Sequence, residues 1–173
     1  MPSAPLHPCA RCAQMQRTCC EQTEIVVTRG DRERIGAASG RDDFWQRRAP
    51  ADAADALVDP DDPNWQRWTV AADGTRAILR HRTDGACTFL SATGCSLDEV
   101  TRPLVCRLYP WTYGEHGIDG DGATYCPTAL LRDSPAGTTM VMSLHMGRDQ
   151  AEFWRTQLYR ELADAAAKGE RHI

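Results

Sequence analysis

The chain has 173 residues, of which 42% are hydrophobic and 25% charged, and 20 basic against 24 acidic residues give a formal net charge of −4 at pH 7. This composition is typical of one soluble globular domain and excludes a disordered chain, and no apolar run approaches the ~18 residues that a membrane span needs. An acidic balance without a basic cluster excludes nucleic acid as a partner.

The chain begins with a short tail and a cysteine-rich segment. We interpret residues 1–8 as a flexible tail. It has neither the basic region nor the apolar region of a secretory signal peptide, so we expect a cytoplasmic protein. Residues 9–20 hold four cysteines, and residues 24–28, EIVVT, predict a short strand because they are β-branched.

Two helices are predicted next. The first covers Arg29–Ser39, since Thr28 can cap it, Asp31 stands three residues further on and Gly40 can close it. The second is short and covers residues 42–48, DDFWQRR.

The middle of the chain predicts a loop and a hairpin. The stretch Ala49–Pro63 is acidic, rich in alanine and bounded by prolines, so we expect a surface loop. Alternating runs on either side of an Asp-Gly pair predict a β-hairpin at Gln66–His81. We interpret Trp65 and Trp68 as part of the packing of this hairpin.

The region from residue 84 to residue 127 is rich in turn residues and cysteines. Only LDEV at 97–100 and LVCRLY at 104–109 resemble helical sequence. Three aromatic residues alternate here, namely Tyr109, Trp111 and Tyr113. We interpret them as a strand that packs its aromatic side chains on the core, the alternative being that they cover a metal cluster.

An amphipathic helix is predicted at 147–170. One face carries apolar residues at helical spacing: Ala151, Trp154, Leu158, Leu162 and Ala165. Asp149 lies in its first turn and Gly169 at its end, as expected for helix termini.

Eight cysteines are the main chemical feature of the sequence. They form two groups of four: Cys9, Cys12, Cys19 and Cys20, then Cys87, Cys95, Cys106 and Cys126. A disulfide framework is disfavoured because it is typical of short secreted chains. Unrelated buried thiols do not account for a CxxC pair close to a CC pair. The pattern therefore favours metal ligation.

The spacing within the first group bears on how many sites there are. A CxxC turn places two sulfur atoms on one side of a tight loop, so Cys9 and Cys12 can bind one ion at about 2.3 Å. In an extended backbone, Cys19 and Cys20 would point to opposite sides and hardly bind the same mononuclear ion. Eight ligands then give two four-coordinate sites, or one four-cysteine cluster and a second site.

The chain resembles the YkgJ family of cysteine-cluster proteins, described as chelating zinc or iron, in four stretches: CARCAQMQRTCC, IVVTRGDRERI, GACTFLSATGCSLDEVTRPLVCRLYP and a late CP. The resemblance covers about Cys9–Pro127 and implies that all eight cysteines are ligands. In one departure from the CxxCxxCC motif, the six residues AQMQRT separate Cys12 from Cys19. This insertion either moves the CC pair to a second site or only lengthens a loop.

Four-thiolate sites suit zinc and iron-sulfur clusters equally well. Ligands that are spread singly favour an iron-sulfur cluster, for example of the 4Fe-4S type, with zinc as the alternative. Arg102 and Arg107 flank Cys106 and either offset thiolate charge or are ordinary surface residues. Each of the five histidines, His7, His81, His116, His145 and His172, is more often a surface or core residue than a ligand. Since His116 lies between Cys106 and Cys126, it is the first to test.

We therefore expect an α+β fold, one small domain organised around a cysteine-bound metal core, with a β-hairpin and an amphipathic C-terminal helix. Residues 9–127 would form the cysteine-cluster domain, and the C-terminal segment of residues 128–173 would pack its helix on the same domain. The expected function is metal binding through thiolates in electron transfer, redox sensing or metal or cluster handling, with a protein partner and no membrane.

Two alternative functions stay open. One is a zinc-stabilised interaction module without catalysis. The other is a cluster-dependent enzyme or accessory subunit, because similar cysteine domains occur in flagellin lysine methylases, where an iron-sulfur cluster and S-adenosylmethionine are implicated. Those chains are larger than this one.

Overall fold

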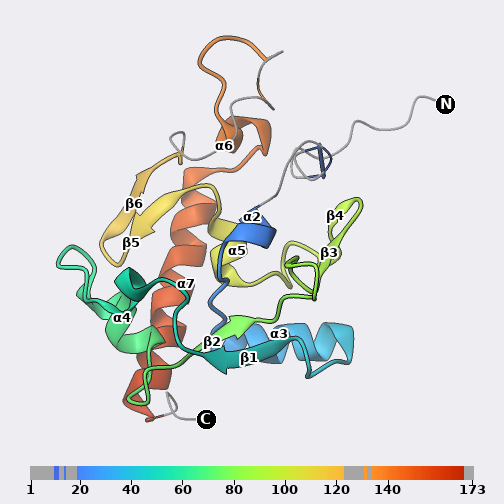
Figure 1. Cartoon of the computed structure of the whole chain (residues 1–173). Coiled ribbons are helices and arrows are strands. Elements are labelled where there is room, and N and C mark those ends of the chain that lie inside the picture. Colours follow the sequence, from blue (N-terminus) through green and yellow to red (C-terminus); the bar gives the residue numbers. More distant parts are fainter. Residues whose placement is uncertain (1–9, 12–13, 15–18, 123–130, 132–133, 170–173) are drawn as a thin grey trace.

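The computed structural model describes residues 10–11, 14, 19–122, 131 and 134–169 (Figure 1). Helices and short antiparallel strand pairs follow one another along the chain, so the fold is mixed α+β, as predicted. Several predictions lie outside the described residues: the tail at 1–8, Cys9, Cys12, Cys126, His7 and His172.

Helix α3 (Arg29–Ser39) has the ends that the sequence predicts. The Thr28 hydroxyl accepts a hydrogen bond from the Asp31 N–H (2.9 Å), and the Asp31 carboxylate accepts one from the Thr28 N–H (3.0 Å). This reciprocal pair is a capping box. Gly40 ends the helix with a φ of 66°, a left-handed conformation that glycine adopts at little cost.

The second predicted helix, at 42–48, is wrong. Trp45–Arg48 form strand β1, which pairs with β2 (Arg76–Leu79) in an antiparallel sheet. Phe44 is buried at the start of the strand, and the guanidinium of Arg32 lies 4.3 Å from the centre of the Trp45 ring. Pairing with β2 and burial of Phe44 stabilise the strand over a short isolated helix.

The strand predicted at 24–28 is reduced to a single bridge. Val26 and Ile78 form an isolated antiparallel bridge on the edge of β2 that β1 leaves open. The Val27 N–H donates to the Ala77 carbonyl (3.0 Å). This segment therefore carries the chain from the first cysteines directly alongside β2.

The predicted hairpin at Gln66–His81 is wrong in its first half, which belongs to helix α4 (Pro63–Thr69). A proline at the first helical position suits this start, and the Trp65 ring packs against Tyr159, with ring centroids 6.1 Å apart. The predicted Asp-Gly turn is present, with Gly74 at a φ of 79°. Packing on the C-terminal helix has overridden the alternating pattern.

The stretch Ala49–Pro63, predicted as a surface loop, does lie largely on the surface. Residues 51–61 are all exposed, and one short 3-10 helix, η1 (Ala53–Ala56), lies within them.

Short elements connect the loop region to the C-terminal helix. They are β3 (Leu90–Ser91), β4 (Gly94–Cys95), α5 (Leu104–Leu108), β5 (Thr112–Gly114), β6 (Gly117–Gly120) and α6 (Met140–Ser143). The helical prediction is confirmed for α5 and wrong for residues 97–100. These form a turn, in which the N–H groups of Thr101 and Arg102 donate to the Asp98 carbonyl (2.9 and 3.0 Å).

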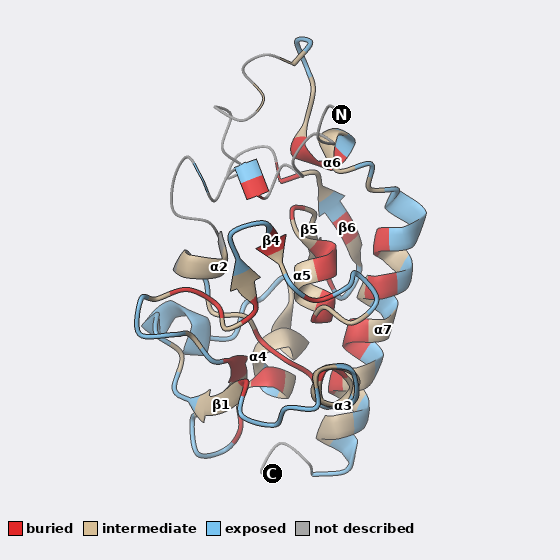
Figure 2. Cartoon of the chain, turned by 90° about the vertical axis from the view of Figure 1, so that its right-hand side faces the viewer, coloured by how far each residue is buried: buried red, intermediate tan, exposed pale blue. Residues whose placement is uncertain are grey.

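Helix α7 (Arg148–Ala167) is the predicted amphipathic helix. Its buried face, the stripe seen in Figure 2, consists of Ala151, Trp154, Leu158, Tyr159 and Leu162. This face packs against α5 and β6 in one apolar core. In the part of the chain that the structure describes, every helix is too short or too polar to cross a membrane.

The aromatic residues near α5 pack on this core. Trp65, Trp68, Trp111 and Tyr113 lie against the α5–α7 cluster, and Tyr109 packs on Met140. The aromatic side chains thus pack on apolar clusters as interpreted, but they do not form one strand, since Tyr109 follows α5, Trp111 precedes β5 and only Tyr113 lies in it. Trp65 and Trp68 pack as residues of a helix rather than of a hairpin.

Candidate metal centre

The four cysteines with described side chains come from four separate parts of the chain. Cys20 lies in the short helix α2 (Cys19–Gln22), Cys87 in the loop after β2, Cys95 at the end of β4 and Cys106 in α5. Cys87, Cys95 and Cys106 are free thiols. In Figure 1, α2, α5 and the β3–β4 hairpin gather above the β1–β2 sheet.

Contacts connect three of these segments directly. The Cys87 N–H donates to the Cys20 carbonyl (3.0 Å). Cys87 belongs to the apolar cluster that also holds Val27 and Phe89, and Cys20 and Cys95 pack against that cluster. One cysteine of the first sequence group thus lies beside members of the second.

Cys106, in α5, lies near enough to these three thiols for their charge to act on it. Burial raises the pKa of this thiol well above its ordinary value, and negative charge on Cys20, Cys87 and Cys95 raises it further. Four thiolates that repel one another in a buried place are stabilised by a cation, which is the situation of a thiolate metal site.

The turn that follows Cys87 directs backbone amides at its sulfur atom. The Phe89 N–H donates to Cys87 Sγ at 3.5 Å. Burial raises the pKa of the Cys87 thiol, while the N–H groups of Phe89 and Leu90 oppose this rise. Amides that converge on an anion form a small concave site, so the turn favours the thiolate that a metal requires.

The β3–β4 hairpin holds Cys95 beside this turn. Cys95 pairs with Leu90 across the hairpin, and the Ser96 N–H donates to the Phe89 carbonyl (2.8 Å). Ala10, almost completely buried, lies 3.9 Å from the position that a Cβ atom on Gly94 would occupy. Ala10, which follows Cys9 in the sequence, therefore lies next to β4.

The structure changes two details of the expected site. Cys19 and Cys20 lie in a helix rather than in an extended backbone, so the argument that they point to opposite sides does not apply. The four thiols that meet also do not follow the two sequence groups. Among the described residues, no three Cys, His, Asp or Glu side chains are already arranged to hold a metal ion.

Arg102 and Arg107, which flank Cys106, donate hydrogen bonds to backbone carbonyls of the loop before α5. Arg102 Nε donates to the Leu97 carbonyl (3.0 Å), and Arg107 Nε donates to the Arg102 carbonyl (2.8 Å). Arg107 also donates to the Val100 carbonyl (2.5 Å). Both side chains thus fix the path of the chain between Cys95 and Cys106.

Two of the described histidines, His116 and His81, differ in how close they lie to the cysteines. His116, the first choice from the sequence, is exposed in the β5–β6 turn and pairs with Asp119 at 2.7 Å. His81 forms an antiparallel bridge with Cys87, and its Nε2 atom is buried without a hydrogen-bond partner in the described chain. The sequence did not single out His81, because its pairing with Cys87 depends on a turn register that composition does not reveal.

A buried carboxylate is a second residue that the sequence did not connect with the site. Asp31, fully buried, accepts a hydrogen bond from the Leu104 N–H (3.1 Å) at the first turn of α5, the helix of Cys106. Burial raises the pKa of Asp31, while Arg34 at 2.8 Å opposes this rise. The capping residue of α3 therefore also positions α5.

Comparison with known proteins adds one match. The model of the family described as "CxxCxxCC: Putative zinc- or iron-chelating domain" matches residues 8–127. A search of the curated proteins and a search of the solved structures gave no significant match.

Proposed function

The chain belongs to the family of zinc- or iron-chelating CxxCxxCC domains, and from this premise we propose that it holds an iron-sulfur cluster through cysteine thiolates. The observation that supports this proposal is that Cys20 and Cys95 pack against the apolar cluster of Cys87, and that Cys106 lies near enough for the charge of these three thiols to act on it. Thiolate is the ligand that both iron-sulfur clusters and zinc prefer.

The residues present fit such a group. The donor set would be four thiolates, and the amides of Phe89 and Leu90 are already directed at the Cys87 sulfur. Hydrogen bonds of this kind and burial are among the factors that set the potential of a cluster. When bound, the cluster would supply one-electron chemistry, which suits electron transfer, redox sensing or cluster handling.

The distribution of the ligands favours a cluster over a structural zinc ion. Structural zinc sites typically use two close pairs of ligands. The four cysteines that meet here come singly from α2, the loop after β2, β4 and α5. Zinc stays the second candidate, since the amide-lined turn at Cys87 suits a zinc thiolate as well.

Cys9, Cys12, Cys19 and Cys126 complete the proposed ligand set. Ala10 supports this for the first pair, because it is packed next to Gly94 and is bonded in sequence to Cys9. These cysteines would serve a second centre or supplement the first.

Elemental analysis of anaerobically purified protein tests the proposal. Iron and acid-labile sulfide in near-equal amounts, with a broad absorption band at about 400 nm, are expected for a cluster. A colourless protein that contains zinc and no sulfide would show that the site holds zinc instead of a cluster. Protein free of iron and zinc would contradict metal binding altogether.

A further inference from the structure

We infer that His81 is a nitrogen ligand of the thiolate centre, an inference that depends on the proposed metal binding. No cysteine motif includes this residue, and three separate observations on the described chain support the assignment.

The first observation is the pairing of His81 with Cys87. Their bridge is flanked by two hydrogen bonds: from the Arg82 N–H to the Ala86 carbonyl (2.7 Å) and from the Thr88 N–H to the Arg80 carbonyl (3.2 Å). Because these bonds lie on either side, His81 and Cys87 form a non-hydrogen-bonded pair. Side chains in such a pair lie on the same face, with Cβ atoms roughly 4.5 to 5.5 Å apart.

The second observation is the direction of this face. Successive side chains of a strand alternate, so His81 lies on the same side as Leu79. Leu79 is 2% exposed and belongs to the apolar cluster that contains Cys87, with Cys20 and Cys95 packed against it. The His81 side chain therefore leaves the backbone on the same face of the strand as the cluster that contains Cys87.

The third observation is the state of the ring. The Nε2 atom of His81 is buried, and no group in the described residues donates to it or accepts from it. A buried polar atom left without a partner costs about 1 to 3 kcal/mol, so native proteins rarely keep one without a reason. An imidazole nitrogen is the commonest metal ligand, and mixed cysteine and histidine sets hold both zinc and iron-sulfur clusters.

X-ray absorption at the edge of the bound metal tests the inference, with His116→Gln as the matched control. His116 is exposed and paired with Asp119, so its replacement removes one histidine away from the thiols. In the wild type and in His116→Gln, we expect a nitrogen shell with the multiple-scattering pattern of imidazole. His81→Gln should lose that shell, and competition with a chelator should show metal affinity reduced at least about tenfold.

The outcomes are distinct. A wild type that binds no metal contradicts the proposed function itself, and the inference with it. A wild type that binds metal with the same spectrum as His81→Gln overturns the inference alone. Should His81→Gln fail to fold, His81→Cys decides, because a thiolate in place of the ring should keep the metal and replace nitrogen by sulfur. An unchanged nitrogen shell in His81→Cys overturns the inference.

Discussion

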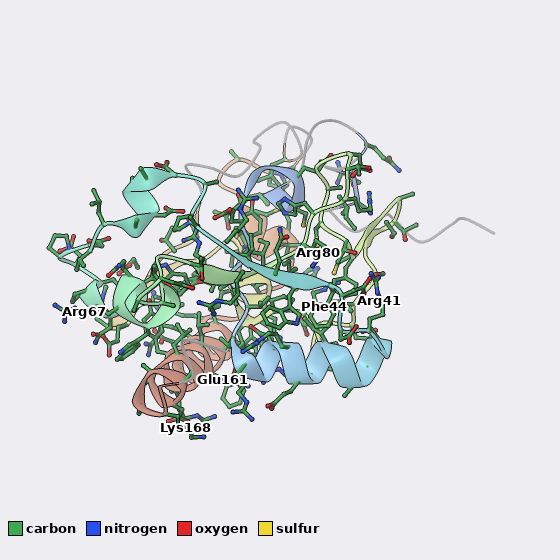
Figure 3. All side chains as sticks on the ribbon, turned by 60° about the horizontal axis from the view of Figure 1, so that its bottom comes forward. Arg41, Phe44, Arg67, Arg80, Glu161 and Lys168 are labelled. Atoms are coloured by element: carbon green, nitrogen blue, oxygen red, sulfur yellow. The ribbon has the colours of Figure 1, made fainter. Side chains whose placement is uncertain are left out.

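Glu161 of α7 points toward α3 (Figure 3). It reaches the first turn of α3, where Gly30 leaves room for its carboxylate. Its carboxylate accepts hydrogen bonds from Arg34 (2.6 Å), from the Thr28 hydroxyl and from Gln157 (2.9 Å). A Cβ atom on Gly30 would lie 2.5 Å from Glu161 Oε2. This single carboxylate thus joins the C-terminal helix to the α3 cap that positions α5.

Replacement of Gly30 by alanine should destabilise the protein although alanine favours helices. The new methyl group would displace Glu161 from its three donors, so we expect a loss of about 1 to 3 kcal/mol in the free energy of unfolding. Gly36→Ala is the control in the same helix, since its Cβ atom would meet only the Arg41 carbonyl at 3.5 Å. It should stabilise by up to about 1 kcal/mol. Urea denaturation measures both.

A double variant tests whether the cost of Gly30→Ala comes from its contact with Glu161. In a Glu161→Ala background, the carboxylate is absent, so Gly30→Ala should no longer cost stability. If the cost of Gly30→Ala persists there unchanged, the contact with Glu161 is not its cause.

Glu24 should make stability depend on pH. Burial, the largest single effect, opposes ionisation. The hydrogen bonds from Arg76 (2.6 Å) and the Ala51 N–H nevertheless hold the pKa of Glu24 below its ordinary value of 4.5. A carboxyl group with a lowered pKa stabilises the fold above the ordinary value, and this contribution disappears as pH falls below it.

The comparison of wild type with Glu24→Gln measures this contribution. Near neutral pH the variant should be less stable by about 1.5 to 3 kcal/mol, as for a hydrogen bond between charged groups. The difference should shrink as pH falls below 4.5, the ordinary pKa value. A difference that is constant from neutral to acidic pH would contradict the assignment. Both proteins are compared in the same metal state, so that metal loss cancels.

The elements show where a sequence pattern suffices and where it does not. Helix α3 could be predicted to the residue, because Thr28, Asp31 and Gly40 fix both ends by local hydrogen bonds and backbone conformation. The segments at 42–48 and 63–69 could not be, since each is short and its conformation depends on a partner that is distant in sequence. Tertiary packing there overrides local preference.

In the candidate site, too, some features could be predicted from the sequence and others depend on tertiary contacts. The spacing of the cysteines predicts metal ligation, whereas the approach of Cys20 to Cys87, Cys95 and Cys106 depends on chain segments that come together in space. The bridge of His81 with Cys87 and the hydrogen bond from Leu104 to Asp31 also form between separate segments of the chain. Composition and periodicity carry no information on such contacts.

The packing of α7 on α5 can be tested within one helix. Leu158 is fully buried, and Phe153 of the same helix is 62% exposed. Leu158→Ala should cost about 2 to 5 kcal/mol in the free energy of unfolding, because it leaves a cavity in the core. Phe153→Ala should change stability by less than about 0.5 kcal/mol, as is usual for a surface position. Equal losses would show that α7 does not pack in this way.

For the molecule as a whole, bound metal should be part of the stability. Cys87 lies in the apolar cluster that also holds Val27 and Phe89, and Cys20 and Cys95 pack against this cluster, so a bound metal would connect α2, the loop after β2 and the β3–β4 hairpin. Removal of the metal with a strong chelator should therefore lower Tm, since a ligand that binds only the folded state stabilises it. An unchanged Tm in protein shown to be free of metal would contradict a structural contribution.

The most direct test of the account is the metal-to-protein ratio of four single variants, Cys20→Ser, Cys87→Ser, Cys95→Ser and Cys106→Ser, purified anaerobically beside the wild type. If the four thiols share one centre, each variant should lose the same metal, and to a similar extent. Loss confined to one or two of the variants, or full retention in all four, would contradict a shared centre.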